Sequence, residues 1–170
     1  MGLIQDVLNR LARVLLAISG VALVSMMFVV MFDVIVRNLG VVIPVFQEIK
    51  YYGAIEVVRY LFLLAMAGAM PWGVEKSQVI VELFTQRMAP HARARLDSVF
   101  LLGFAVFGAL MAYSLFGAGA HALTTGETTP DLLLPIAPIR YATGCCMALM
   151  ALRAAVEGIQ GLRMGVLHAG

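Results

Sequence analysis

The sequence predicts an all-α integral membrane protein with four transmembrane helices. Residues 98–126 contain no Asp, Glu, Lys or Arg. At about 1.5 Å per helical residue, these roughly 29 residues more than cross a ~30 Å hydrocarbon core. The composition agrees, because the chain is 62% hydrophobic and 13% charged, about half the charge of a soluble domain. A net charge of +2 excludes nucleic acid as a partner. The length suits a single four-helix domain over residues 1–170.

Four apolar segments supply these helices, at about residues 13–36, 56–74, 96–122 and 139–162. The first resembles a signal peptide in one respect, because Arg10 and Arg13 precede it. Its uncharged centre, residues 14–32, is longer than a signal peptide needs, and Asp33 follows it where small residues would mark a cleavage site. We therefore expect the first helix to be retained as a membrane span.

The distribution of basic residues predicts that both termini face the cytoplasm. The side that holds the termini carries twice as many as the other side, namely Arg10, Arg13, Lys76, Arg87, Arg93, Arg95, Arg153 and Arg163 against Arg37, Lys50, Arg59 and Arg140. Aromatic residues agree, since Tyr60 and Tyr141 would mark the outer interface and Trp72 the inner one. The turn-rich segment 124–135 then lies outside.

Short interfacial amphipathic helices are expected on both sides of the second span. Four polar residues share one helical face at its outer end: Glu48, Tyr52, Glu56 and Arg59. Two interpretations stay open for this segment: a helix over residues 44–56 lying in the interface, or an early start of the second span. On the inner side, Ser77 is a suitable N-cap for a short helix that would end at Pro90.

The residues that catalysis or a cofactor would need are scattered. Haem ligation between helices needs paired histidines at matching depths, but His91, His121 and His168 lie in a loop, at a helix end and in the tail. Cys145 and Cys146 are adjacent, so their side chains point about 100° apart on a helix and suit packing better than a disulfide. Potential metal ligands do not cluster. We therefore expect no enzyme activity, no metal and no cofactor.

Three acid–base pairs stand at helical spacing within or beside the spans: Asp33 with Arg37, Glu56 with Arg59, and Arg153 with Glu157. Charges in a bilayer are costly, so these residues need a purpose. We interpret the pairs, together with Glu48, as helix anchors or as contacts with a partner subunit. The alternative is an independent small proton-coupled transporter, which would use an isolated carboxylate whose pKa is raised by burial.

Small residues in the third and fourth helices predict close packing. Gly108 with Ala112, and Gly144 with Ala148, stand four residues apart, as helix-packing motifs require. Midplane transport sites are usually built from interrupted helices, but here a proline, Pro71, interrupts only the inner end of the second helix. The residues alone therefore predict a bundle that packs against something else.

Three segments together carry a resemblance to a known family. They are FDVIVR at residues 32–37, EVVRYLF at 56–62, and GETTP at 126–130 followed by LLP at 133–135 and Tyr141. Their order and spacing resemble the small membrane subunit (DctQ-type) of tripartite ATP-independent periplasmic (TRAP) transporters, over nearly the whole chain. The segment GVEKSQVI at 73–80 departs from the family pattern, in which a glycine-histidine-like step is expected.

The resemblance implies a function and a set of partners. In that family the small subunit pairs with a large multi-span membrane subunit, which holds the substrate and sodium sites. A periplasmic substrate-binding protein delivers organic acids, and the small subunit acts as a fixed scaffold in the lipid of a bacterial inner membrane. The residues of this chain expected to face the binding protein are Gly126, Glu127, Pro130, Asp131 and Pro135.

The predicted topology can be tested by cysteine labelling. In a background lacking Cys145 and Cys146, the changes Gly2→Cys, Gln86→Cys and Thr128→Cys place single thiols in three segments. Only the thiol at position 128 should react with an impermeant reagent added from the periplasm, because the basic residues hold the other two segments inside. Labelling at position 86 instead would invert the topology.

Overall fold

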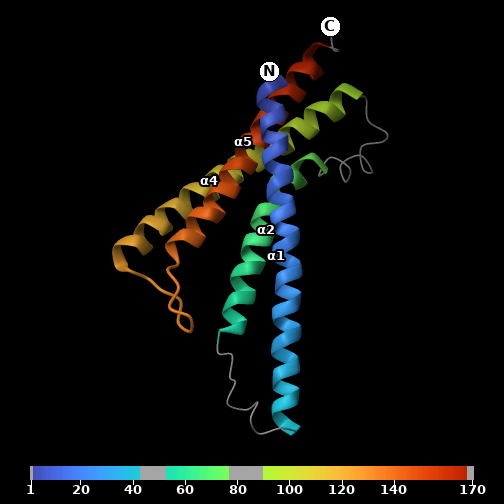
Figure 1. Ribbon diagram of the computed structural model, residues 1–170. Helices are drawn as coiled ribbons and strands as arrows, with labels where there is room; N and C mark the ends of the chain where they lie inside the picture. The colour runs from blue at the N-terminus through green and yellow to red at the C-terminus, as the bar shows by residue number, and fades with distance from the viewer. Residues whose placement is uncertain (1, 43–52, 77–89, 168–170) are drawn as a thin grey trace.

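Four long helices make up the part of the chain that the structure describes. The computed structural model describes residues 2–42, 53–76 and 90–167. Its helices are α1 (Gly2–Val42), α2 (Ala54–Lys76), α4 (Pro90–Thr125) and α5 (Ala137–Leu167) (Figure 1). Each of the four is long and apolar enough to cross a membrane, which confirms the predicted fold class. Residues 126–136, here called the outer loop after the position predicted for them, join α4 to α5 and contain an antiparallel bridge between Thr128 and Pro135.

The helices extend beyond the predicted spans. The predicted boundaries followed the first flanking charges, but a helix continues into water once its apolar segment is fixed. Accordingly α1 begins at Gly2 and α4 begins at Pro90, where a proline is tolerated because the first helical N–H has no partner in any case. The predicted interruption at Pro71 is wrong, because α2 continues through it to Lys76. Glu48 and the predicted amphipathic helix after Ser77 lie outside the described residues.

The bundle consists of two antiparallel helix pairs. α1 lies beside α2, α4 lies beside α5, and the main contact between the pairs is that of α2 with α5. The pairs meet near the end that holds both termini and diverge toward the outer loop (Figure 1). The α2–α5 crossing is therefore the main site at which the two pairs are held together.

A stripe of small residues brings α4 close to α5. Buried or half-buried positions of α4 recur at alternating spacings of three and four residues, as in a coiled coil: Ser98, Leu101, Ala105, Gly108, Ala112, Leu115, Gly119 and Ala122. A Cβ added to Gly108 would lie 2.8 Å from Met150 Cε and 3.1 Å from Ala151 Cβ. Close approach of this kind lets dispersion contacts hold the two helices together. Such contacts matter in lipid, because the hydrophobic effect does not drive helices together there.

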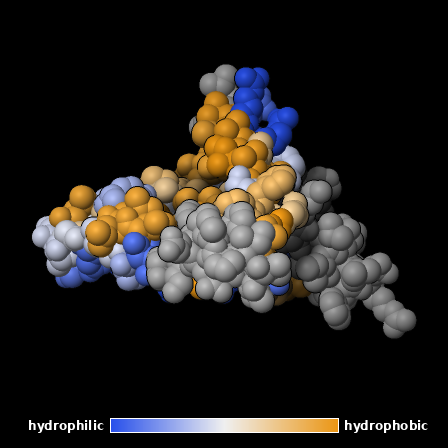
Figure 2. Space-filling model, turned by 60° about the horizontal axis from the view of Figure 1, so that its bottom comes forward, coloured by the Kyte–Doolittle hydropathy of each residue, from blue (hydrophilic) through white to orange (hydrophobic). Residues whose placement is uncertain are grey.

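The pairing of α1 with α2 uses a similar stripe on one side of α1. Its less exposed positions follow the same spacing: Gln5, Leu8, Ala12, Leu15, Ser19, Ala22, Met26, Val29, Asp33 and Val36. Gly68 of α2 leaves room for the Ser19 hydroxyl, which a Cβ at Gly68 would overlap. The remaining circumference of α1 is apolar and uncovered, since only 6% of its most apolar window is buried. In Figure 2 hydrophobic residues cover much of the upright part of the surface below a hydrophilic tip, and they lie beside hydrophilic residues on the lobe at the left.

Replacement of Gly108 tests the α4–α5 contact. Gly108→Leu should lower the melting temperature of the purified protein in detergent by several degrees, because overpacking a close contact costs about 1–3 kcal/mol. Gly103 is a matched control on the same helix, because a Cβ there has no neighbour within 4 Å. Gly103→Leu should melt like the unaltered chain, and equal melting of the two variants would contradict the packing.

Candidate functional site

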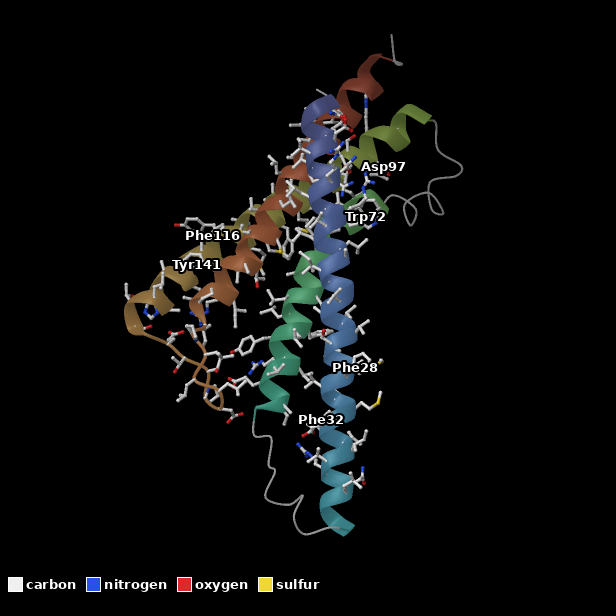
Figure 3. The ribbon with its side chains drawn as sticks, in the orientation of Figure 1. Phe28, Phe32, Trp72, Asp97, Phe116 and Tyr141 are labelled. Carbon is white, nitrogen blue, oxygen red and sulfur yellow. The ribbon has the colours of Figure 1, made fainter. Side chains whose placement is uncertain are left out.

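The most buried polar residue at the crossing of α2 and α5 is Arg153. Its exposed fraction is 1%. Its Nη1 donates a 2.9 Å hydrogen bond to the carbonyl oxygen of Pro71, and its Nε lies 3.1 Å from Glu157 Oε1. The guanidinium carbon lies 5.4 Å from the centroid of the Trp72 ring, which stands where the helix pairs meet (Figure 3). One side chain of α5 therefore contacts two consecutive residues of α2 and an acid of its own helix.

These contacts explain how a charge and a proline are accommodated inside the bundle. A buried charge is tolerated when it is paired and its donors are used, and a planar guanidinium can stack on an aromatic ring while it donates at its edges. The topology prediction had counted Arg153 among the basic residues flanking the membrane. The structure corrects this, because Arg153 is buried between helices. Its bond to the Pro71 carbonyl supports α2 at the proline itself.

Asp33 and Arg37 form an ion pair on α1. Arg37 Nε lies 3.0 Å from Asp33 Oδ2, and the side chains of Arg37 and Asp33 are 66% and 20% exposed, respectively. Asp33 belongs to the less exposed stripe of α1, whereas Arg37 reaches the surface. A pair with one exposed partner contributes little to stability. The exposed guanidinium of Arg37 is therefore available to a neighbouring subunit or lipid.

Glu56 has a different partner from the one predicted. Its Oε2 accepts a 2.8 Å hydrogen bond from the backbone N–H of Leu132 in the outer loop. Glu56 is 6% exposed, and its Oε1 has no hydrogen-bond partner in the described part of the chain. Arg59 is exposed and makes no ion pair with Glu56. The predicted Glu56–Arg59 pair is therefore wrong, because the first turn of α2 aims the carboxylate at the loop.

A charged cluster closes the beginning of the outer loop. Glu127 accepts from Arg140 at 3.0 Å and lies 3.5 Å from His121 Nδ1. Arg140 also donates to the carbonyl oxygen of Ala118 at 2.9 Å, so it bridges the end of α4 to the loop. Gly126 has a φ of 66°, a left-handed conformation that glycine adopts without strain and that ends α4.

The rest of the outer loop is folded around Thr129. Thr129 is fully buried, and its Oγ1 accepts a 3.0 Å hydrogen bond from the N–H of Leu134. Pro130, Asp131 and Pro135 are exposed around it. Together with Gly126 and Glu127, the predicted outer residues thus occupy one ordered loop. Leu133 stands out, because it is 71% exposed and has a φ of 54°.

The residues with potential chemical reactivity are not gathered into a site. In the described ranges, no group of three His, Cys, Asp or Glu side chains could hold a metal ion. Cys145 is exposed and Cys146 is buried, and both are free thiols. A cavity of about 210 Å³ lies between α2, α4 and α5 and is lined by apolar residues: Met70, Gly73, Val74, Phe104, Phe107 and Met150.

Comparison with known proteins identifies the family. Residues 26–164 match the family model described as tripartite ATP-independent periplasmic transporters, DctQ component. The chain belongs to this family. It is thus a small membrane subunit of a TRAP transporter, a component of a transport system, and a multi-pass membrane protein with four spans. No curated protein and no solved structure matches it.

The structure of this DctQ-family subunit also places the small residues named from sequence. Gly108 and Ala112 lie on the α4 stripe, Gly144 lies against Phe116, and Ala148 packs at the edge of the core. The sequence motifs missed further close contacts, in which Gly158 meets Leu101 and Leu102, and Gly161 meets the Ser98 hydroxyl. The three-and-four spacing of small residues along α4 is the signal that would have revealed this longer seam.

Two polar features near the termini were likewise missed. Gln5 Nε2 donates a 2.6 Å hydrogen bond to Gln160 Oε1, which links α1 to α5 in this subunit. Asp97, labelled in Figure 3 near the same end, has a buried Oδ1 without a hydrogen-bond partner among the described residues. The link between the two glutamines spans nearly the whole chain, so no local sequence pattern reports it.

Substitution of Arg153 tests the joint between the helix pairs. Arg153→Ala should destabilise the subunit by about 3–5 kcal/mol, because removal of one partner leaves buried polar groups uncompensated. Arg153→Lys should recover only part of this, since an ammonium cannot stack and fork as a guanidinium does. Thermal denaturation in detergent measures both.

Arg37→Ala is the matched control for Arg153. It removes an arginine from an i,i+4 pair whose arginine is exposed, so it should cost no more than about 1 kcal/mol. Comparable losses of stability in Arg37→Ala and Arg153→Ala would show that the burial of Arg153 does not increase its contribution to stability.

Proposed function

We propose that this chain is a static membrane subunit that braces the large subunit of its TRAP transporter. The transporter would take up an organic acid, delivered by a periplasmic binding protein and driven by an ion gradient, with sodium as the coupling ion. Membership of the DctQ family supports the association with both partners. The observation that carries the static role is that the buried Arg153 joins α5 to α2, while the cavity between the helices has an apolar lining.

Three buried polar side chains of the spans bond to groups of this chain. Arg153 binds the Pro71 carbonyl and Glu157, while the hydroxyls of Ser19 and Thr143 each donate to a carbonyl four residues earlier on their own helix. The cavity between α2, α4 and α5 has an apolar lining and so offers no site for a carboxylate or a cation. Substrate and ion binding are therefore assigned to the large subunit.

The exposed face of α1 is the proposed contact with the large subunit. α1 is the least buried of the four spans, and its uncovered side carries two large aromatic residues, Phe28 and Phe32, which are 59% and 58% exposed (Figure 3). Aromatic side chains supply much of the contact area at interfaces. The neighbouring Asp33–Arg37 pair lies at the same end of α1 and would mark the edge of this contact.

The orientation follows from the basic residues of the flanks. We place both termini in the cytoplasm and the outer loop in the periplasm of a bacterial inner membrane, in keeping with the positive-inside rule. When Arg153 is left out of the basic residues that flank the membrane, the side that holds the termini still carries more of them than the other side. Gly126, Glu127, Pro130, Asp131 and Pro135 then face the binding protein.

One observation favours a second candidate, an independent proton-coupled transporter. Glu56 is buried and its Oε1 is unpaired within the described residues, and a lone carboxylate is what a proton carrier uses. The chain reconstituted alone should show no substrate-dependent proton flux if the bracing role holds. Flux that is present in the unaltered chain and lost in Glu56→Gln would establish the second candidate instead.

Copurification tests the bracing role. The double change Phe28→Ala and Phe32→Ala should lower recovery of the large subunit on a tagged small subunit by about tenfold, because both rings lose packing contacts with it; tenfold corresponds to about 1.4 kcal/mol. Phe100→Ala is the matched control, because Phe100 is 54% exposed on α4 and should change nothing. An unaltered chain that recovers no large subunit would refute the proposal.

A further inference from the structure

The residues at the start of α2 contact the outer loop at one loop residue, Leu132. The Leu132 N–H donates to Glu56 Oε2 at 2.8 Å. The Leu132 side chain covers Gly53, where an added Cβ would lie 2.5 Å from Leu132 Cγ. Glu56 and Gly53 are three residues apart, so a single turn of chain holds Leu132 by both its backbone and its side chain.

The two residues that follow Leu132 form an exposed apolar tip. Leu133 is 71% exposed and Leu134 is 46% exposed. Leu133 has a φ of 54°, in the left-handed region that bulky residues rarely adopt. Thr129 holds the other side of the tip through the Leu134 N–H. Strained residues persist where the surroundings fix them, and such positions cluster at clamps and contact sites.

Stability alone does not account for an acid at position 56. Glu56 is nine-tenths buried, and its Oε1 has no hydrogen-bond partner in the ranges the structure describes, which is costly for a carboxylate. The Leu132 N–H needs only an acceptor, whether charged or neutral. The side chain at 56 is thus a holder of Leu132 rather than half of an ion pair.

We propose that Glu56 is a positioning residue that holds Leu132 so that Leu133 and Leu134 project as a docking tip for the periplasmic binding protein. The inference rests on the proposed function and specifies which loop residues make the contact. The outer loop, which carries the tip, lies at the end of the α4–α5 pair away from both termini (Figure 1). Exposed Asp131 stands two residues before Leu133, and an acid at this position disfavours an anionic lipid surface as the occupant.

Transport measured against binding-protein concentration tests the role. The small subunit is reconstituted with the large subunit in vesicles, and uptake is followed as the loaded binding protein is raised. Glu56→Met removes the acceptor at similar size, and Leu133→Asn keeps a residue that tolerates a left-handed φ while it removes the apolar tip. Each should raise the half-maximal concentration about tenfold and leave the maximal rate unchanged.

Three further variants separate positioning from charge and from general damage. Glu56→Gln keeps an acceptor and should stay within about twofold of the unaltered chain. Gly53→Val keeps the carboxylate but displaces Leu132, so it should behave like Glu56→Met. Leu123→Asn is the control, because Leu123 is 64% exposed at the end of α4 and outside the loop, and it should have no effect.

Several results would overturn the inference. One is an unchanged half-maximal concentration in Glu56→Met and Leu133→Asn. Another is a Glu56→Gln variant that is as impaired as Glu56→Met. A third is a lower maximal rate, or a lower recovery of the large subunit, with no change in the half-maximal concentration. A defect in Leu133→Asn that follows the anionic lipid content of the vesicles would assign the tip to lipid. Uptake by the unaltered complex that ignores the binding protein would instead refute the proposed function itself.

Discussion

The two helix pairs are joined at the crossing of α2 and α5, where the buried guanidinium of Arg153 makes the most buried polar contact between them. The bond to the Pro71 carbonyl and the stacking near Trp72 join α5 to α2, and the contact with Glu157 fixes the direction of the side chain. Gly68 with Ser19 and Gly108 with Met150 are close contacts within a pair. Gln5 with Gln160 and Glu56 with Leu132 are further links between the pairs, one near each end of the molecule.

The same division between local and distant interactions explains what the sequence could predict. Hydropathy located all four spans, since membrane insertion depends on the composition of each segment alone. Pairs at i,i+4, such as Asp33 with Arg37, are likewise local. The partner of Glu56 is a backbone N–H in a loop far along the chain, and no periodicity reports it. The burial of Arg153 could not be predicted from the sequence either. A basic residue near the end of a span can equally well lie in the flank outside the membrane, and only the position of α2 beside α5 distinguishes the two.

Many polar side chains in this molecule form hydrogen bonds with backbone groups rather than with other side chains. Arg153, Arg140, Glu56 and Thr129 all bind main-chain atoms of another element or of the outer loop. A main-chain carbonyl or N–H is present whatever the residue type, so these contacts leave no trace in residue pairs or motifs. That is why the outer loop could be recognised as turn-rich but its internal order could not be foreseen.

The divergence of the two helix pairs has a consequence for the bilayer around them. The uncharged part of α4, residues 98–125, is roughly 42 Å long, whereas the hydrocarbon core measures ~30 Å. Burial of all of it requires a tilt of about 45°, slightly beyond the roughly 0–40° that helices in membranes adopt. α1 and α2 run in a different direction from α4 and α5 (Figure 1), so one pair can stand upright while the other leans. The molecule is thereby matched to a particular hydrophobic thickness, and a thicker or thinner membrane would strain its joint before it disturbed either pair.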